Sequence, residues 1–223
     1  MDEYYSNQLN SNKLKKCYDI APERIQQFLC SEIEFVRNQL KSTDTLLDIG
    51  CGYGRVVKPL ANYAHSVIGV DISVESIELA NRYTQNYTNC KYYVMNAKKM
   101  SFPDNFFDVS ICVQNGISAF KIDPFILLSE ALRVTKKGGI VLFSSYSPKF
   151  WEHRLHWFQL QSALQLIGEI DYEKTKDGII LCKDGFKATT FLPKDFNSLL
   201  NKLEKKGELI EIDNSILFCK IIK

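Results

Sequence analysis

The sequence predicts a single α/β domain with a doubly wound, mostly parallel sheet that ends in an antiparallel hairpin. Short apolar runs alternate with amphipathic stretches over residues 44–145, which is typical of parallel strands joined by covering helices. Two further apolar runs flank Asp213-Asn214 and indicate the hairpin. The length of 223 residues fits one such domain carrying one insertion.

The parallel part of the sheet is predicted from five short runs rich in apolar and β-branched residues, at 45–49, 66–70, 91–95, 107–114 and 139–145. Helices are expected at 55–62, 73–85 and 124–134, and another at 21–41 before the first strand, with Pro22 suited to its first turn. The run Lys136-Lys137-Gly138-Gly139 is typical of the end of a helix, because basic residues and then glycine favour that position.

The last quarter of the sequence predicts a helix at 193–206, stopped by Gly207, and strands at 208–213 and 215–222. Residues 146–192 are too many for an ordinary connection of about 2 to 6 residues, so they are interpreted as an inserted cap. Within the cap, Asp184-Gly185 suits a type I′ hairpin turn.

Composition excludes some classes of protein. The 28 basic and 26 acidic residues give a net charge of +2, which favours neither a nucleic-acid nor a membrane surface. No apolar run approaches the roughly 20 residues of a membrane span, and the first residues show no signal-peptide core, so we expect a cytoplasmic protein. The seven cysteines form no C-x-x-C pair, and no metal site is predicted. No motif sets an oligomeric state.

A glycine-rich turn is the most informative motif. Asp48-Ile49-Gly50-Cys51-Gly52-Tyr53-Gly54-Arg55 runs from a buried strand towards a helix, and glycine lets the backbone approach a ligand there. A dinucleotide fingerprint needs a third glycine where Arg55 stands, which disfavours a nicotinamide dehydrogenase. Asp71 ends the second strand, where a carboxylate accepts hydrogen bonds from ribose hydroxyls.

The sequence resembles the class I S-adenosylmethionine-dependent methyltransferases over about residues 44–146. The resemblance is carried by the glycine turn, by Asp71, by Asn96-Ala97 followed by the run 102–108, and by the run 133–139. It implies a Rossmann-like fold and S-adenosylmethionine as cofactor. It also implies four parts: an N-terminal helical lid (1–43), a cofactor-binding core (44–145), a substrate cap (146–192) and a C-terminal helix and hairpin (193–223).

The same resemblance assigns roles to residues. Gly50, Cys51 and Gly52 would lie under the methionine part of the cofactor, Asp71 would hold the ribose, and Ile72 would pack on the adenine. Asn96 stands where the family often has an acid, and its amide oxygen and the Ala97 N–H would meet the adenine; a loop cap is the other interpretation of Asn96. Gln114 would lie near the reacting methyl. Asp48 is either a ligand group or an orienter of the turn.

The acceptor site is predicted less sharply. Methyl transfer needs alignment and exclusion of water more than a base, and the loop after strand four contains neither His nor an acid. Tyr5, Asn115 and His153 are the weak catalytic candidates. The aromatic and basic run 150–158 is either a wall for an anionic small molecule or an amphipathic helix that buries Trp151, Leu155 and Phe158 with His153 and Arg154 solvated.

The predicted function is methyl transfer from S-adenosylmethionine to a small molecule, without nucleic-acid or membrane partners. One alternative uses the same cofactor without donating the methyl, by aminocarboxypropyl transfer, cyclisation or lyase chemistry. Another is a protein that binds the cofactor without catalysis.

Overall fold

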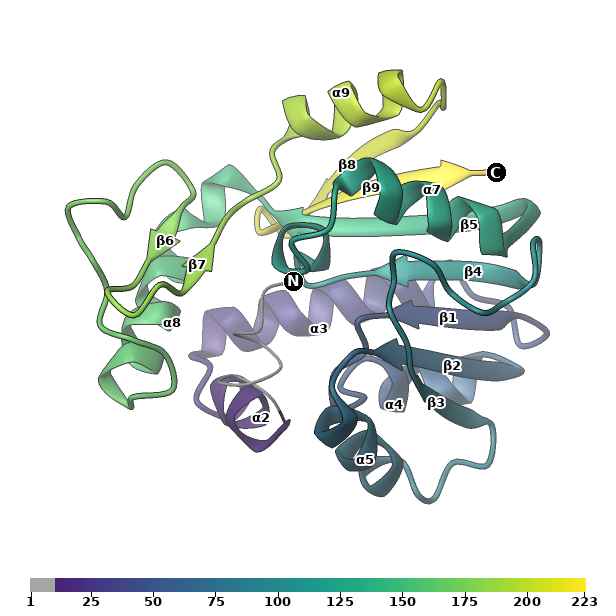
Figure 1. The fold of residues 1–223 in the computed structure, drawn as a ribbon, viewed down its shortest axis with the longest axis horizontal. Coiled ribbons are helices and arrows are strands. Elements are labelled where there is room, and N and C mark those ends of the chain that lie inside the picture. Colours follow the sequence, from purple (N-terminus) through teal and green to yellow (C-terminus); the bar gives the residue numbers. More distant parts are fainter. Residues whose placement is uncertain (1–10) are drawn as a thin grey trace.

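The computed structural model describes residues 11–223, which fold around one seven-stranded sheet (Figure 1). Its strand order is β3-β2-β1-β4-β5-β9-β8. The first five of these strands are parallel, and β9 is antiparallel to both β5 and β8. The strands are β1 Thr45–Ile49, β2 Ser66–Asp71, β3 Cys90–Val94, β4 Phe107–Cys112, β5 Thr135–Tyr146, β8 Glu208–Ile212 and β9 Ile216–Ile222.

Helices cover both faces of this sheet, as a doubly wound fold requires. One core layer joins α3, α4 and α5 to the sheet face that carries Leu46, and the other joins α7 and α9 to the face that carries Leu47. Neighbouring residues of a strand point to opposite faces, so a continuous apolar strand serves both layers. The helices here are α2 Ser11–Asp19, α3 Glu23–Arg37, α4 Val57–Leu60, α5 Val74–Tyr83, α6 Gly116–Ala119, α7 Pro124–Val134, α8 Trp151–Ala163 and α9 Pro193–Lys202.

The predicted fold class is confirmed, and two local expectations are wrong. Residues 136–139 do not end a helix: α7 stops at Val134, and β5 begins at once with extended Thr135, which pairs with Phe107. Gly138, at φ 75°, then sits where the register between β4 and β5 shifts. The helix expected at 55–62 shortens to α4 and a 3-10 turn, Ala61–Tyr63, and Pro59 within it lacks the N–H that a helix ladder needs.

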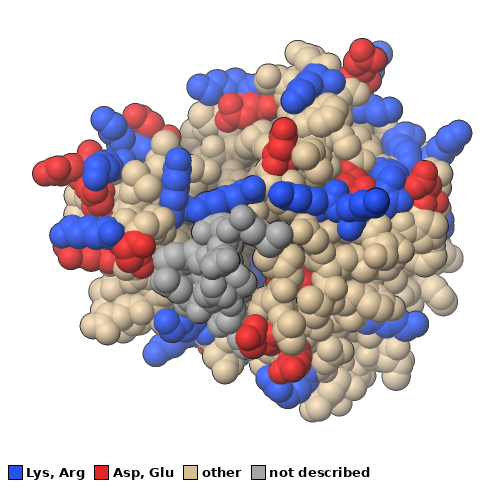
Figure 2. All heavy atoms as spheres, viewed as in Figure 1, with Lys and Arg blue, Asp and Glu red and all other residues tan. Residues whose placement is uncertain are grey.

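The segment between β5 and α9 lies at the carboxyl ends of the parallel strands, beside α2 (Figure 1). It contains a short 3-10 helix, Pro148–Phe150, then α8, and the two-stranded hairpin of β6 Ile180–Leu181 and β7 Lys187–Ala188. Figure 2 views the same side of the molecule and shows a row of Lys and Arg side chains, with Asp and Glu side chains on both sides of it.

The turn of the cap hairpin differs from the expected type. A type I′ turn needs a positive φ at both central residues, but of Asp184 and Gly185 only Gly185 has one, at 93°. The Cys182 N–H donates to the Phe186 carbonyl at 2.9 Å, which closes a three-residue loop with glycine in the left-handed position. The paired left-handed residues occur instead between β8 and β9, at Asp213 (φ 54°) and Asn214 (φ 48°).

Candidate active site

A cavity of about 230 Å³ opens where the parallel strands end. Three groups of residues line it. The glycine turn, the end of β2 and the loop after β3 contribute Gly50, Gly52, Asp71, Ile72, Asn96 and Ala97; the ends of β4 and β5 contribute Gln114, Asn115 and Tyr146; and α2 and the cap contribute Leu14, Cys17, Tyr18, Arg154, Trp157, Phe158, Gln161 and Phe186. Most of the predicted cofactor residues therefore share one cavity with residues of the cap.

The glycine turn is held against β2 and leaves no room for side chains. The N–H groups of Gly50 and Cys51 both donate to the Val70 carbonyl, at 2.8 and 3.0 Å. A Cβ on Gly50, whose φ is 80°, would lie 2.1 Å from the Phe120 ring. Glycine is thus required at this position by both conformation and space.

Asp71 connects the end of β2 to this turn. One carboxylate oxygen accepts the Gly52 N–H at 3.0 Å, and the other accepts the Ser73 N–H at 2.9 Å. Burial raises the pKa of Asp71, against these backbone hydrogen bonds. Each carboxylate oxygen has a second lone pair, so the pair of oxygens suits two adjacent hydroxyls. Ile72 beside it is 40% exposed, which leaves an apolar surface at the cavity.

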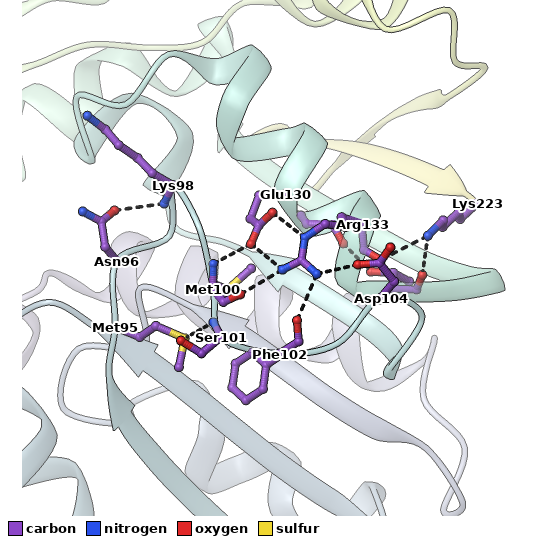
Figure 3. Close-up of polar contacts among 12 residues, drawn as sticks. Met95, Asn96, Lys98, Met100, Ser101, Phe102, Asp104, Glu130, Arg133 and Lys223 are labelled. Carbon is purple, nitrogen blue, oxygen red and sulfur yellow. Dashed lines mark hydrogen bonds and ion pairs between the residues drawn. The ribbon is translucent and has the colours of Figure 1, made fainter.

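Asn96 and Ala97 begin a loop that is fixed from below (Figure 3). The Asn96 side-chain oxygen accepts the Lys98 N–H at 2.9 Å, so the loop-cap interpretation describes this oxygen. A ligand amino group can still reach its second lone pair.

Arg133 of α7 anchors the rest of this loop (Figure 3). Its guanidinium donates to the Met100 and Phe102 carbonyls, both at 2.9 Å, and to the Asp104 carboxylate at 2.6 Å. Both oxygens of Glu130 also accept from it, at 2.7 and 2.8 Å. Burial raises the pKa of Glu130, but the hydrogen bonds from Arg133 and the Met100 N–H outweigh it and keep that pKa below its usual value.

Two consecutive non-glycine residues after β4 have a left-handed backbone, Gln114 at φ 54° and Asn115 at φ 62°. Such strain persists only where surrounding contacts impose it. The Asn115 amide nitrogen donates to the Thr189 carbonyl at 2.7 Å, and its oxygen accepts from the Ser145 hydroxyl at 2.8 Å. Asn115 therefore joins β5 to the cap with both ends of its side chain.

Glu32 of α3 holds Gln114 in this conformation. This fully buried carboxylate accepts the Gln114 backbone N–H at 2.7 Å and the Ser144 hydroxyl at 2.6 Å through the same oxygen. Its second oxygen lies 3.4 Å from the Arg55 guanidinium, which stacks on the Tyr18 ring at 4.7 Å. Glu32 went unnoticed in the sequence, although a charged residue in line with Phe28 and Val36 on an apolar helix face was a signal.

The cap helix differs from both interpretations of the run 150–158. His153 is exposed and does not line the cavity, whereas Arg154 is buried, with 1% exposed. The Arg154 guanidinium donates to the Gly178 carbonyl at 2.9 Å and the Thr190 hydroxyl at 2.5 Å, and lies 4.4 Å from the Tyr146 ring centre. The expectation of a solvated Arg154 is wrong, because the hairpin folds back over this face of α8.

The remaining candidates lie elsewhere. Asp48 and Cys51 are buried beneath the glycine turn and do not line the cavity. Tyr5 lies outside the described residues. Within residues 11–223, no cluster of three or more His, Cys, Asp or Glu residues could hold a metal, and no helix is both long and apolar enough to cross a bilayer.

The helix α2 was not predicted, and it covers the cavity. Leu14, Cys17 and Tyr18 line it from this helix. The Trp157 indole N–H of α8 donates to the Cys17 carbonyl at 2.9 Å, so α2 and the cap are joined over the strand ends.

This arrangement defines a class of protein: a Rossmann-like domain that binds a nucleoside-containing ligand at the carboxyl ends of its strands. Residues 47–143 match the family model described as a methyltransferase domain. Through this domain the chain belongs to the class I S-adenosylmethionine-dependent methyltransferases.

Relatives support the assignment at two levels. Over 148 residues, which are 59% of this chain and 46% of the relative, the sequence is 32% identical to a 2-methyl-6-phytyl-1,4-hydroquinone methyltransferase of Synechocystis sp.. The chain thus spans about half the length of that relative. The PH0226 protein of Pyrococcus horikoshii has the same fold, with a TM-score of 0.66, 22% identity and coverage of 100% and 99% of the two chains. The protein of a DhpI-SAM-HEP complex gives a TM-score of 0.68 at 17% identity, covering 99% and 95%.

Proposed function

We propose that this protein transfers the methyl group of S-adenosylmethionine to a small molecule. The observation that carries the proposal is the single cavity in which Asp71 and the glycine turn face an aromatic cap. When bound, the cofactor supplies an electrophilic methyl on a positively charged sulfur. The rest of the catalytic task is alignment and exclusion of water.

The chain's own residues suit the cofactor. Asp71 would hold the ribose hydroxyls, Ile72 and Ala97 would border the adenine, and Gly50 and Gly52 would admit the methionine part close to the backbone. Asn96 would accept from the adenine amino group. Asp48 and Cys51 would act from beneath, by shaping the turn, since neither lines the cavity.

A dedicated base is not part of the proposal. His153 is exposed, and both polar ends of the Asn115 side chain bind neighbouring segments. We assign Asn115 to the support of the cap and expect catalysis to come from proximity within an enclosed site.

The acceptor is proposed to be a small molecule, with an anionic group as one form that the cavity suits. Arg154 carries a guanidinium in the cap half of the cavity, and guanidinium groups bind carboxylates and phosphates. The Synechocystis relative is named for a hydroquinone acceptor, which is also a small molecule. We further propose a cytoplasmic setting without nucleic-acid partners, in keeping with seven free cysteines.

The proposal is tested by incubating purified protein with S-adenosylmethionine that carries a deuterated methyl, with and without a small-molecule cell extract. Mass spectrometry should find the heavy methyl on an extract component, and the variant Asp71→Asn should lose most of that signal. Label that remains in methylthioadenosine would instead indicate transfer or cyclisation of the aminocarboxypropyl chain. Cofactor binding without any turnover would favour a binding protein.

A further inference from the structure

Tyr146 is the point where polar groups of the cavity meet its aromatic wall. This residue ends β5, is 4% exposed, and borders the cavity together with Trp157, Phe158 and Phe186. Its hydroxyl oxygen accepts a hydrogen bond from Gln114 Nε2 at 3.1 Å. A phenol that accepts at its oxygen keeps its own proton for donation to another group.

The direction of that hydrogen bond is set by a buried carboxylate. Glu32 fixes the Gln114 backbone at 2.7 Å and the Ser144 hydroxyl at 2.6 Å, and these two residues stand at the ends of neighbouring strands. The carboxylate thereby sets the spacing at which the Gln114 amide reaches Tyr146. Because the amide nitrogen is the donor, the Tyr146 proton is directed away from Gln114.

The surroundings of this hydroxyl are apolar and flat. The rings of Trp157 and Phe158 meet at 71°, with centroids 5.9 Å apart, and Phe186 lies 5.9 Å from Phe158. Aromatic walls favour planar ligands, and a phenol among them provides one directional contact.

We propose that Tyr146 donates a hydrogen bond to an oxygen of the methyl acceptor, and that the acceptor is a planar, apolar ring bearing that oxygen. Gln114 and Glu32 act through Tyr146 as positioning residues. The inference rests on the proposed function, because it takes the cap half of the cavity as the acceptor site. No proton is transferred in this contact; the hydroxyl orients the ring while another atom receives the methyl.

The test uses two rings that differ by one hydroxyl, 4-fluorophenol and fluorobenzene, and measures their dissociation constants by ¹⁹F NMR with and without S-adenosylhomocysteine. The wild-type protein should bind 4-fluorophenol at least fivefold more tightly than fluorobenzene. In Tyr146→Phe this ratio should fall to about one. The matched control Tyr172→Phe should keep the wild-type ratio, because Tyr172 is 64% exposed and does not line the cavity.

Gln114→Glu tests the direction of the hydrogen bond. A carboxylate at this position accepts from the Tyr146 hydroxyl, so the ratio should fall towards one although the phenol is still present. If this variant does not fold, Tyr146→Phe decides. A wild-type ratio near one, no binding of either ring, or an unchanged ratio in Tyr146→Phe or a folded Gln114→Glu would overturn the inference. The readout is ring binding, so its failure is distinguishable from a failure to transfer the methyl.

Discussion

Asp48 is a carboxylate enclosed by the parallel sheet, 3% exposed between Leu47 and Ile49. Its Oδ2 atom has no hydrogen-bond partner in the described part of the chain. Burial raises the pKa of Asp48 to about 7, with Arg55 opposing the shift and Glu32 adding to it. Since the side chain does not line the cavity, its position favours the orienting role over direct ligand contact.

Asp48→Asn should change how stability depends on pH. The folded protein holds the Asp48 proton up to about pH 7, whereas an unfolded Asp releases it near pH 4. Between these values the folded state binds more protons, so this group lowers the free energy of unfolding as pH rises. In urea titrations, the variant should gain about 1 to 3 kcal/mol relative to wild type between pH 5 and pH 8. A difference independent of pH would contradict this prediction.

Asp71→Ala should weaken the binding of S-adenosylhomocysteine by about 1 to 3 kcal/mol, because two ribose hydroxyls lose a charged acceptor. Isothermal titration calorimetry measures this directly. Asp171→Ala is the control, since that residue does not line the cavity and should bind normally. Equal affinity in wild type and Asp71→Ala would remove the ribose assignment.

At the scale of elements, the loop after β3 depends on one side chain of α7. Arg133 donates to two carbonyls and two carboxylates, and a lysine cannot reproduce this planar fork. Arg133→Lys should therefore lower the free energy of unfolding by about 1 to 3 kcal/mol. Hydrogen exchange followed by mass spectrometry should show faster exchange confined to residues 97–104. Uniform acceleration over the whole chain would argue against a local anchor.

We propose that α2 is a lid over the cofactor, held to the cap by the hydrogen bond from Trp157 to the Cys17 carbonyl. Trp157→Phe keeps an aromatic ring but removes the donor. It should accelerate amide exchange in α2 and raise the dissociation rate of S-adenosylhomocysteine several-fold. Trp151→Phe, in the same helix but away from the cavity, is the matched control. Equal dissociation rates in the two variants would leave α2 without a lid function.

At the scale of the whole molecule, the ligand would join the turn, the loop after β3 and the lid, so binding should stabilise the fold as a unit. At a hundredfold excess over its dissociation constant, S-adenosylhomocysteine should add about 2.7 kcal/mol to the free energy of unfolding. For a chain of this size the melting temperature should rise by about 5 to 10 °C. NADH should give no such shift, and a larger shift with NADH would restore the dehydrogenase class.

The sequence by itself determined the order and type of most elements. Strand 45–49 and helix 124–134 occur with the predicted bounds, because their signals are local: an apolar run in one case, and a helical period with Pro124 in the first turn in the other. The pairing of strands around Asp213-Asn214 was equally local. The glycine turn and Asp71 were readable because a ligand that approaches backbone restricts residue type at fixed spacing.

Only the tertiary structure decided which side chains meet. Glu32 and Gln114 are 82 residues apart, and Asn115 and Thr189 are 74 apart, so no periodic pattern reports their contacts. The same holds for Arg154, which looked solvated in the sequence and is buried because a distant hairpin covers it. A local pattern specifies an element since its energy is local, whereas the acceptor half of the cavity is made by contacts between segments that only the folded chain brings together.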